Sequence, residues 1–251
     1  MITYEYPLTE RTRTLLRLED LFGRARHFLA RTDPRDHHAA LVTLFEILEV
    51  CGRGELKSEL LQELERLRQA MLGFRGNARI DQGKLASVLE RIEQARAAIH
   101  GLSGKIGQHL RANEWLMSIR QRTSIPGGVC EFDLPTYHRW LHHPVVRRSA
   151  DLAAWMLPLQ PIEDATAVAL GLLRESGMPE NQVATRGLFQ QMMTGRVAQM
   201  IRIGLDDESV AVPEASANRY ALNIRFVITG DEPRPRAIET DVPFDLTFCS
   251  I

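Results

Sequence analysis

Three histidines that lie close together in the sequence are the first candidates for chemistry. His138 and His142 are four residues apart in a predicted helix, and His143 follows directly. Because residues four apart share a face of a helix, two of these imidazoles could hold one metal ion, and His37-His38 could add a ligand. No Glu-His catalytic motif surrounds them, and histidines at a surface or edge are far commoner than metal ligands. A metal-dependent hydrolase built on His138, His142 and His143 is therefore kept as the alternative interpretation.

Cys130 and the preceding glycine pair carry weaker signals. Cys130 and His138 are residue types that can form a nucleophile and its base, but no orienting acid or oxyanion loop accompanies them. Gly127-Gly128 lies between a helical pattern and a strand pattern, whereas a phosphate-binding loop requires the strand first and the helix last. We therefore predict a protein that is not an enzyme, with no catalytic residues, no metal and no cofactor.

Arginine is the remaining residue type with a clear chemical role, because its guanidinium group binds carboxylates through two parallel hydrogen bonds. Residues 101–150 hold 7 Lys or Arg and 3 Asp or Glu, whereas residues 151–251 hold 8 and 14. Any single arginine is more often a solvated charge than a ligand. Several in one cleft, however, would focus positive potential and attract an acidic peptide. The candidates are Arg17, Arg111, Arg120, Arg122, Arg219 and Arg225.

Composition limits the classes of protein to which the chain can belong. A net charge of −1 over 251 residues does not indicate a nucleic-acid partner. The local arginine excess keeps a nucleic-acid-binding regulator as a third interpretation, although no helix-turn-helix is recognisable. No apolar run approaches the roughly 20 residues of a membrane span, and the N-terminus does not resemble a signal peptide. Together with three widely spaced cysteines, Cys51, Cys130 and Cys249, these features predict a cytoplasmic protein with reduced thiols that does not contact a membrane.

The first part of the chain has the apolar spacing of amphipathic helices. Leu60, Leu64 and Leu67, for example, recur at intervals of three and four residues. Similar stripes predict helices near residues 15–29, 41–48, 56–71, 85–99 and 106–119, and again at 136–143, 145–156 and 162–175. Consecutive helices of this length favour an antiparallel bundle.

The last part of the chain has the period-two alternation of strands. Tyr220, Leu222, Ile224 and Phe226 alternate with residues that would point to the opposite face. Strands are predicted within residues 187–193, 199–205, 219–228 and 242–248. A short apolar run at residues 129–132, between glycines and a proline, predicts a lone strand that joins the C-terminal sheet.

These patterns predict an α+β fold, in which an N-terminal antiparallel helical bundle precedes a C-terminal, mostly antiparallel β-sheet domain that includes the strand near residues 129–132. The predicted helical domain comprises residues 1–124 and 136–180. The predicted β-domain comprises residues 125–135 and 181–251.

Several motifs, in order along the chain, resemble those of one known family. They are Tyr6-Pro7-Leu8-Thr9-Glu10, Arg53-Gly54-Glu55, Ile106-Gly107-Gln108, Ser124-Ile125-Pro126-Gly127-Gly128, Phe132-Asp133-Leu134-Pro135-Thr136 with His138 and Trp140-Leu141, and Ile224-Arg225-Phe226. This set resembles the ZapD family of bacterial cell-division proteins, which bind the tubulin-like polymer protein FtsZ. A series of separated matches in the right order is specific, whereas any one of them alone would not be.

The resemblance implies more than composition and periodicity do. It implies a helical domain that forms a homodimer, a β-domain, and binding of the acidic C-terminal tail of FtsZ, so that the dimer cross-links FtsZ protofilaments at the mid-cell division ring. It implies a basic binding surface made of Arg17, Arg111, Arg120, Arg122, His138, Arg219 and Arg225. One departure is Glu114, which stands where a relative carries arginine and lowers the positive charge expected near Arg111.

Overall fold

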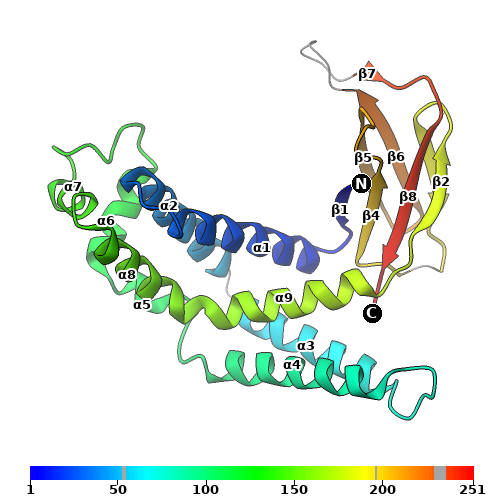
Figure 1. Ribbon diagram of the computed structural model, residues 1–251, viewed down its shortest axis with the longest axis horizontal. Coiled ribbons are helices and arrows are strands. Elements are labelled where there is room, and N and C mark those ends of the chain that lie inside the picture. Colours follow the sequence, from blue (N-terminus) through cyan, green and yellow to red (C-terminus); the bar gives the residue numbers. More distant parts are fainter. Residues whose placement is uncertain (53–54, 196, 229–235) are drawn as a thin grey trace. The chain divides into compact units, whose positions relative to one another are not determined.

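The structure is a computed structural model that describes residues 1–52, 55–195, 197–228 and 236–251 (Figure 1). Arg53 and Gly54, which belong to one of the family-like motifs, lie outside the described residues. The helical elements are α1 (Glu10–Leu29), α2 (Pro34–Cys51), α3 (Leu56–Leu72), α4 (Gln82–Gly101), α5 (Gln108–Arg111), α6 (Glu114–Thr123), α7 (Pro135–Leu141), α8 (Val145–Met156), the 3₁₀ turn η1 (Leu157–Leu159) and α9 (Gln160–Glu175). The strands are β1 (Ile2–Pro7), β2 (Glu180–Ala184), β3 (Leu188–Met192), β4 (Met200–Leu205), β5 (Ala211–Ala217), β6 (Ala221–Ile228), β7 (Arg236–Ala237) and β8 (Val242–Cys249).

The predicted α+β class is confirmed, with helices in the N-terminal part and antiparallel strands in the C-terminal part. The chain divides into two compact units. A β-unit contains Met1–Arg13 and Leu170–Ile251, and a helical unit contains Thr14–Ala169. None of the helices in the described ranges combines the length and the apolar character that a membrane crossing requires.

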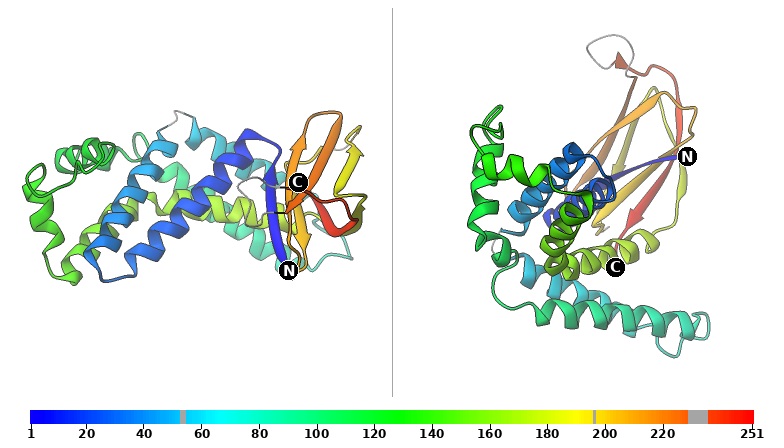
Figure 2. Two further views of the ribbon diagram at one scale, coloured as in Figure 1. Left: turned by 90° about the horizontal axis from the view of Figure 1, so that it is seen from above. Right: turned by 60° about the vertical axis from the view of Figure 1, so that its left-hand side comes forward.

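The predicted apolar stripes form the core of the helical unit. Leu41, Leu44 and Leu48 of α2 are buried, as are the leucines of α3 at positions 60, 64 and 67. Helices α3 and α4 run alongside each other, as Figures 1 and 2 show. Asp81 fixes the start of α4, because its carboxylate accepts hydrogen bonds from the backbone N–H groups of Gly83 and Lys84 at 2.9 and 3.1 Å.

A buried arginine joins two helix ends in this unit. The Arg148 guanidinium donates to the carbonyl oxygens of Leu141 and His143, at the C-terminal end of α7, and to Thr32 O beyond α1, at 2.6 to 2.8 Å. Its Nε also donates to His37 Nδ1 at 3.0 Å. Because Nδ1 is then an acceptor, the imidazole proton lies on Nε2, which donates to Arg31 O at 2.8 Å. A cation at these helix C-termini satisfies carbonyls that have no partner within their own helices.

The strands form two antiparallel sheets that share one core. One sheet has the order β1-β4-β8-β2, and the other has the order β3-β6-β5, with β7 pairing with β6. Aromatic side chains from both sheets meet between them, because the Phe244 ring centroid lies 5.0 Å from that of Phe226 and 5.2 Å from that of Phe189. The β-unit is therefore a sandwich whose inner faces are apolar.

The first strand of the sandwich comes from the N-terminus, which the sequence analysis did not assign to a strand. Ile2 pairs with Leu205 and Pro7 with Met200, so that β1 forms an edge of the first sheet. Tyr4, Tyr6 and Leu8 pack against the shared core. These three side chains alternate with Thr3, Glu5 and Pro7, a period-two pattern typical of a strand.

The predicted strand at residues 129–132 is wrong. This segment consists of consecutive turns, in which the backbone N–H groups of Cys130 and Asp133 donate to Gly127 O and Cys130 O at 3.2 and 3.1 Å. Gly127 has φ +70°, a conformation that favours glycine and starts the turns. Because these backbone N–H groups already donate within the turns, they are not available for hydrogen bonds to a neighbouring strand. Phe132 is 81% exposed, which is inconsistent with a place in the sheet core.

The Arg148 network gives a stability prediction. Replacing Arg148 with alanine leaves His37 Nδ1 and three carbonyl oxygens without their donor in a buried site, which should lower the free energy of unfolding by about 3 kcal/mol. Arg147→Ala, one residue earlier and exposed, should change it by no more than about 0.5 kcal/mol. Urea denaturation at one fixed protein concentration measures both. Equal effects of the two substitutions would show that the network does not contribute to stability.

The corrected turn segment gives a second prediction. Cys130 is exposed, whereas Cys51 and Cys249 are buried. Burial raises the pKa of the Cys51 thiol to about 12 and also raises the pKa of Cys249. At pH 8, a thiol reagent should therefore modify one cysteine per native chain rapidly, and Cys130→Ser should abolish this phase until denaturant is added. Rapid reaction of three native thiols would contradict the burial of Cys51 and Cys249.

Candidate functional site

The segment with the clearest family-like motif is anchored by an aromatic cluster. Tyr137 stacks on Trp140, with ring centroids 5.8 Å apart and an interplanar angle of 15°. Trp115 lies 6.0 Å from Trp140 and 5.9 Å from Trp155. The Trp140 indole N–H also donates to Asp151 at 2.9 Å. Tyr137 and Trp140 thus fix α7 against α6 and α8, so these two motif residues have a structural role.

His38 and Tyr137 form a neutral polar pair in the same cluster. The Tyr137 hydroxyl and His38 Nδ1 are 2.7 Å apart. Burial lowers the pKa of His38 and raises the pKa of Tyr137, so neither group is charged near neutral pH. The hydrogen bond between them satisfies two polar groups of the cluster, and the tautomer of His38 decides which of the two groups donates it.

The histidines that could have held a metal lie at the surface of α7. The rings of His138 and His142 are 4.4 Å apart, and His142 Nδ1 is bonded to the backbone carbonyl of His138 at 2.8 Å. His138 Nε2 lies 3.7 Å from a Glu131 carboxylate oxygen. Among the residues that the structure describes, no group of three or more His, Cys, Asp or Glu side chains is arranged to hold a metal. The geometry therefore gives the hydrolase alternative no support.

The predicted basic residues divide between the units. Arg17, Arg111, Arg120, Arg122 and His138 belong to the helical unit, and Arg219 and Arg225 belong to the β-unit. Arg120 and Arg122 lie together in the last turn of α6. Arg120 forms an ion pair with Glu49, and Arg122 Nη1 lies 3.5 Å from Asp133. Arg17 is exposed on α1.

Arg111 differs from the other predicted ligands because its guanidinium holds backbone carbonyls. It donates to Ile106 O at 2.6 Å and to Leu48 O at 3.0 Å. Glu114, the departure from the family pattern, occupies the first turn of α6 next to the capping residue Asn113. A carboxylate there is favourable because the N-terminus of a helix is electropositive. Glu114 therefore has a local structural role.

The two arginines of the β-unit lie near the hairpin between β5 and β6. The Arg219 guanidinium carbon lies 4.4 Å from the centroid of the Tyr220 ring, and both side chains are exposed. The Arg225 Nη2 is 2.7 Å from the Glu214 carboxylate on the neighbouring strand. Arg225 and Glu214 point away from the core, so this ion pair faces solvent.

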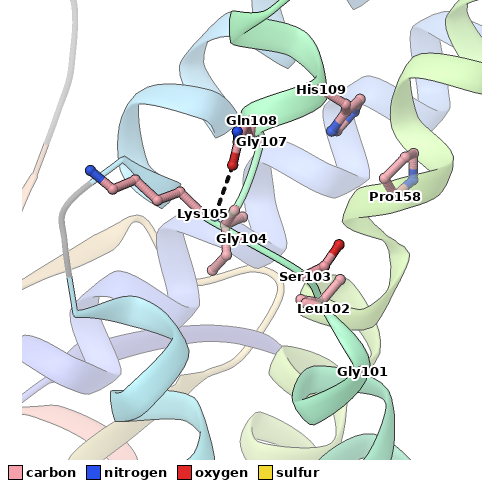
Figure 3. A pocket seen from close by; sticks show the side chains of 10 residues that line it. Gly101, Leu102, Ser103, Gly104, Lys105, Gly107, Gln108, His109 and Pro158 are labelled. Atoms are coloured by element: carbon pink, nitrogen blue, oxygen red, sulfur yellow. Dashed lines mark hydrogen bonds between the residues drawn. The ribbon is translucent and has the colours of Figure 1, made fainter.

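A hollow of about 490 Å³ lies beside the segment from Gly101 to His109 (Figure 3). The Ser103 hydroxyl and the His109 ring lie on the side of Pro158, whereas Lys105 extends away from them. Lys57 Nζ holds the Leu102 carbonyl at 2.6 Å. Arg111 holds a second carbonyl of this loop, so two cationic side chains attach the segment to the helices around it.

Sequence reasoning missed the edge where β1 and β5 face each other. A hollow of about 480 Å³ lies there, with Arg13 at its rim and Ile201 and Leu222 in its floor. The period-two pattern of residues 2–8 was the available signal for β1. No comparable signal marked β5, because its sequence, Ala-Val-Pro-Glu-Ala-Ser-Ala, has low strand propensity.

Comparison with known proteins gives a consistent result. The model of the family described as "ZapD: Cell division protein" matches residues 16–225. The chain is 55% identical over 251 residues to a protein named "Cell division protein ZapD" from Azoarcus sp. (strain BH72), covering 100% of both chains. Proteins of the same name from Aromatoleum aromaticum and Dechloromonas aromatica are 53% and 55% identical over 251 and 253 residues, with 100% of this chain and 98% and 100% of theirs covered.

The order of the motifs, the α+β fold and full-length similarity thus agree, and the chain belongs to the ZapD family of cell-division proteins.

Proposed function

We propose that this protein is a non-enzymatic adaptor that binds the acidic C-terminal tail of FtsZ and cross-links FtsZ protofilaments at the mid-cell division ring, in the cytoplasm. The observation that carries the proposal is family membership, which extends over residues 16–225 and over the full length of three relatives named as cell-division proteins. The segment at residues 124–141, which resembles the family most clearly, is present in full.

Exposed guanidinium groups supply the chemistry for binding an acidic tail. Arg120, Arg122 and Arg225 have side chains that are 35%, 45% and 56% exposed, and each is paired with a surface carboxylate. A surface ion pair contributes roughly 0–1 kcal/mol, so a carboxylate of the tail can replace the intramolecular partner at little cost. Together with Arg17, Arg111, His138 and Arg219, these residues form the proposed contact set.

Two equivalent sites would make weak contacts effective. We propose that the protein is a homodimer formed through its helical unit, Thr14–Ala169. A dimer that holds one tail on each protomer can bridge two protofilaments. The second contact is then intramolecular, with a high effective concentration, so the bridge is stronger than either contact alone.

Co-sedimentation with FtsZ polymers tests the proposed function. The protein should increase the amount of FtsZ pelleted at low speed, and FtsZ that lacks its C-terminal tail should show no increase. Rising salt should reduce the effect, because exposed charges are screened over about 8 Å at physiological ionic strength. An increase that is equal with and without the tail would contradict tail binding, and no increase at low salt would contradict cross-linking.

A matched pair of variants tests the arginines within the same assay. Arg219→Glu combined with Arg225→Glu reverses two charges near the β5–β6 hairpin and should weaken pelleting while the chain stays folded. Arg186→Glu changes an exposed arginine of the same unit outside the proposed set and should leave pelleting unchanged. Unaltered pelleting with the double variant would exclude Arg219 and Arg225 from the contact set.

A further inference from the structure

One edge of the sandwich has backbone groups available for hydrogen bonding. In β5, Pro213 faces away from its neighbour β6, because its carbonyl oxygen accepts a hydrogen bond from the Tyr6 hydroxyl of β1. Its partner Phe226 accordingly donates its N–H to Gly187 O, on the opposite side of β6, at 2.8 Å. Backbone direction alternates along a strand, so Ala215 and Ala217 also direct their N–H and C=O groups outward. None of the strands in the described part of the chain pairs with β5 on this side.

The outward-facing edge is short. Proline has no N–H to donate, and Tyr6 already occupies the Pro213 carbonyl. At the other end of the strand, the Ala211 N–H bonds the Ser209 hydroxyl at 3.3 Å. Among the described residues of this edge, Ala215 and Ala217 retain both an outward N–H and an outward C=O, which is enough for about three residues of an added strand.

Next to these groups, the sandwich has a hollow of about 480 Å³. The inward side chains of β5 at this point are alanines, which are too small to fill the space between the sheets. Leu8, Ile201 and Leu222 provide apolar surface in the same hollow, and the last two are fully buried. A larger apolar side chain that arrives with an added strand would fill this space and be removed from water.

The charges around the edge favour a carboxylate. Arg13 lines the hollow with a side chain that is 46% exposed, and its Nε lies 3.5 Å from the nearest oxygen of Glu10. Arg219 is exposed two residues beyond the end of β5. The nearby Glu214 is on the outer face of the sheet and is paired with Arg225 at 2.7 Å. Neither arginine is therefore fully neutralised by a close, buried carboxylate.

We propose that the β5 edge binds a short extended peptide from another protein as an added antiparallel strand. An apolar side chain of the peptide fills the hollow, and a glutamate or aspartate two residues away, on the same face of the added strand, binds Arg13. This mode uses backbone hydrogen bonds for affinity and side-chain pockets for specificity. A second copy of β5 fits poorly as the added strand. In each copy Pro213 has no N–H to donate, and its carbonyl already accepts a hydrogen bond from Tyr6, so two such strands would form fewer hydrogen bonds with each other.

The probe is a capped, fluorescently labelled peptide, Thr-Val-Thr-Leu-Thr-Glu-Thr-Val, in which leucine and glutamate share one face of the strand; it is titrated into the full-length chain and followed by anisotropy. In an added strand, the residues whose side chains point into the hollow are also those whose backbone N–H and C=O groups form hydrogen bonds with β5. N-methylation of the leucine should therefore abolish binding, whereas N-methylation of the threonine that follows it should not. Equal binding of the two methylated peptides, or no saturable binding of the parent peptide, would overturn the proposal.

Two variants locate the site. Ala215→Pro removes an outward N–H and leaves the hydrogen bonds between β5 and β6 intact, because the proline at position 213 of the same strand is tolerated in the same way. This substitution should abolish binding of the probe. Arg13→Ala should weaken binding of the probe about tenfold. A probe with glutamine in place of glutamate should bind the unaltered protein about tenfold more weakly as well. Combining this probe with Arg13→Ala should cause no further loss of affinity. The exposed control Arg91→Ala, on α4, should bind normally. Full binding by a folded Ala215→Pro variant would also overturn the proposal. If that variant does not fold, the comparison of the two N-methylated peptides tests the proposal instead.

The probe contains no FtsZ sequence, and Arg13 and Ala215 are outside the contact set proposed for the FtsZ tail. Loss of FtsZ pelleting and loss of probe binding are therefore separate results.

Discussion

The pairing of β1 with β4 is the constraint on which the β-unit depends. Six residues at the N-terminus form the edge of a sheet whose other strands come from residues 180–249. Glu5 then accepts hydrogen bonds from Arg174 of α9 at 2.8 and 2.7 Å, and Arg202 Nε lies 3.2 Å from the same carboxylate. The two ends of the chain are thus held together by a ladder, a shared core and a partly buried ion cluster.

The same strand determines which parts of the sandwich edge are accessible. The Tyr6 hydroxyl occupies the Pro213 carbonyl, and Leu8 contributes to the hollow beside Ala215. An edge strand with open backbone groups is a risk for uncontrolled pairing. Here a proline and a tyrosine restrict pairing to a short stretch, and this restriction is what makes the edge suitable for a short peptide segment.

Local patterns were enough to predict the helices and the strands β3, β4, β6 and β8. Leu60, Leu64 and Leu67 are all buried, as their spacing indicated, and the alternation in β6 matches its burial. The turns at residues 129–132 were mistaken for a strand because an apolar run bounded by glycine and proline fits both structures. The role of Arg148 had no local signal, because its partners at Thr32 and His37 are more than 100 residues away. The basic residues could be named from motifs, but only coordinates show that Arg111 holds backbone carbonyls, that Arg120 is partly exposed and that Arg122 is exposed.

The proposed adaptor role requires each dimer to hold two acidic tails through salt-sensitive contacts. Sedimentation velocity with a labelled peptide of the cognate FtsZ tail measures the mass of the protein and the number of bound peptides together. We expect a dimer that carries two peptides at low salt and progressively fewer as salt rises. A chain that is monomeric at all concentrations, or a dimer that binds no peptide at low salt, would contradict the account.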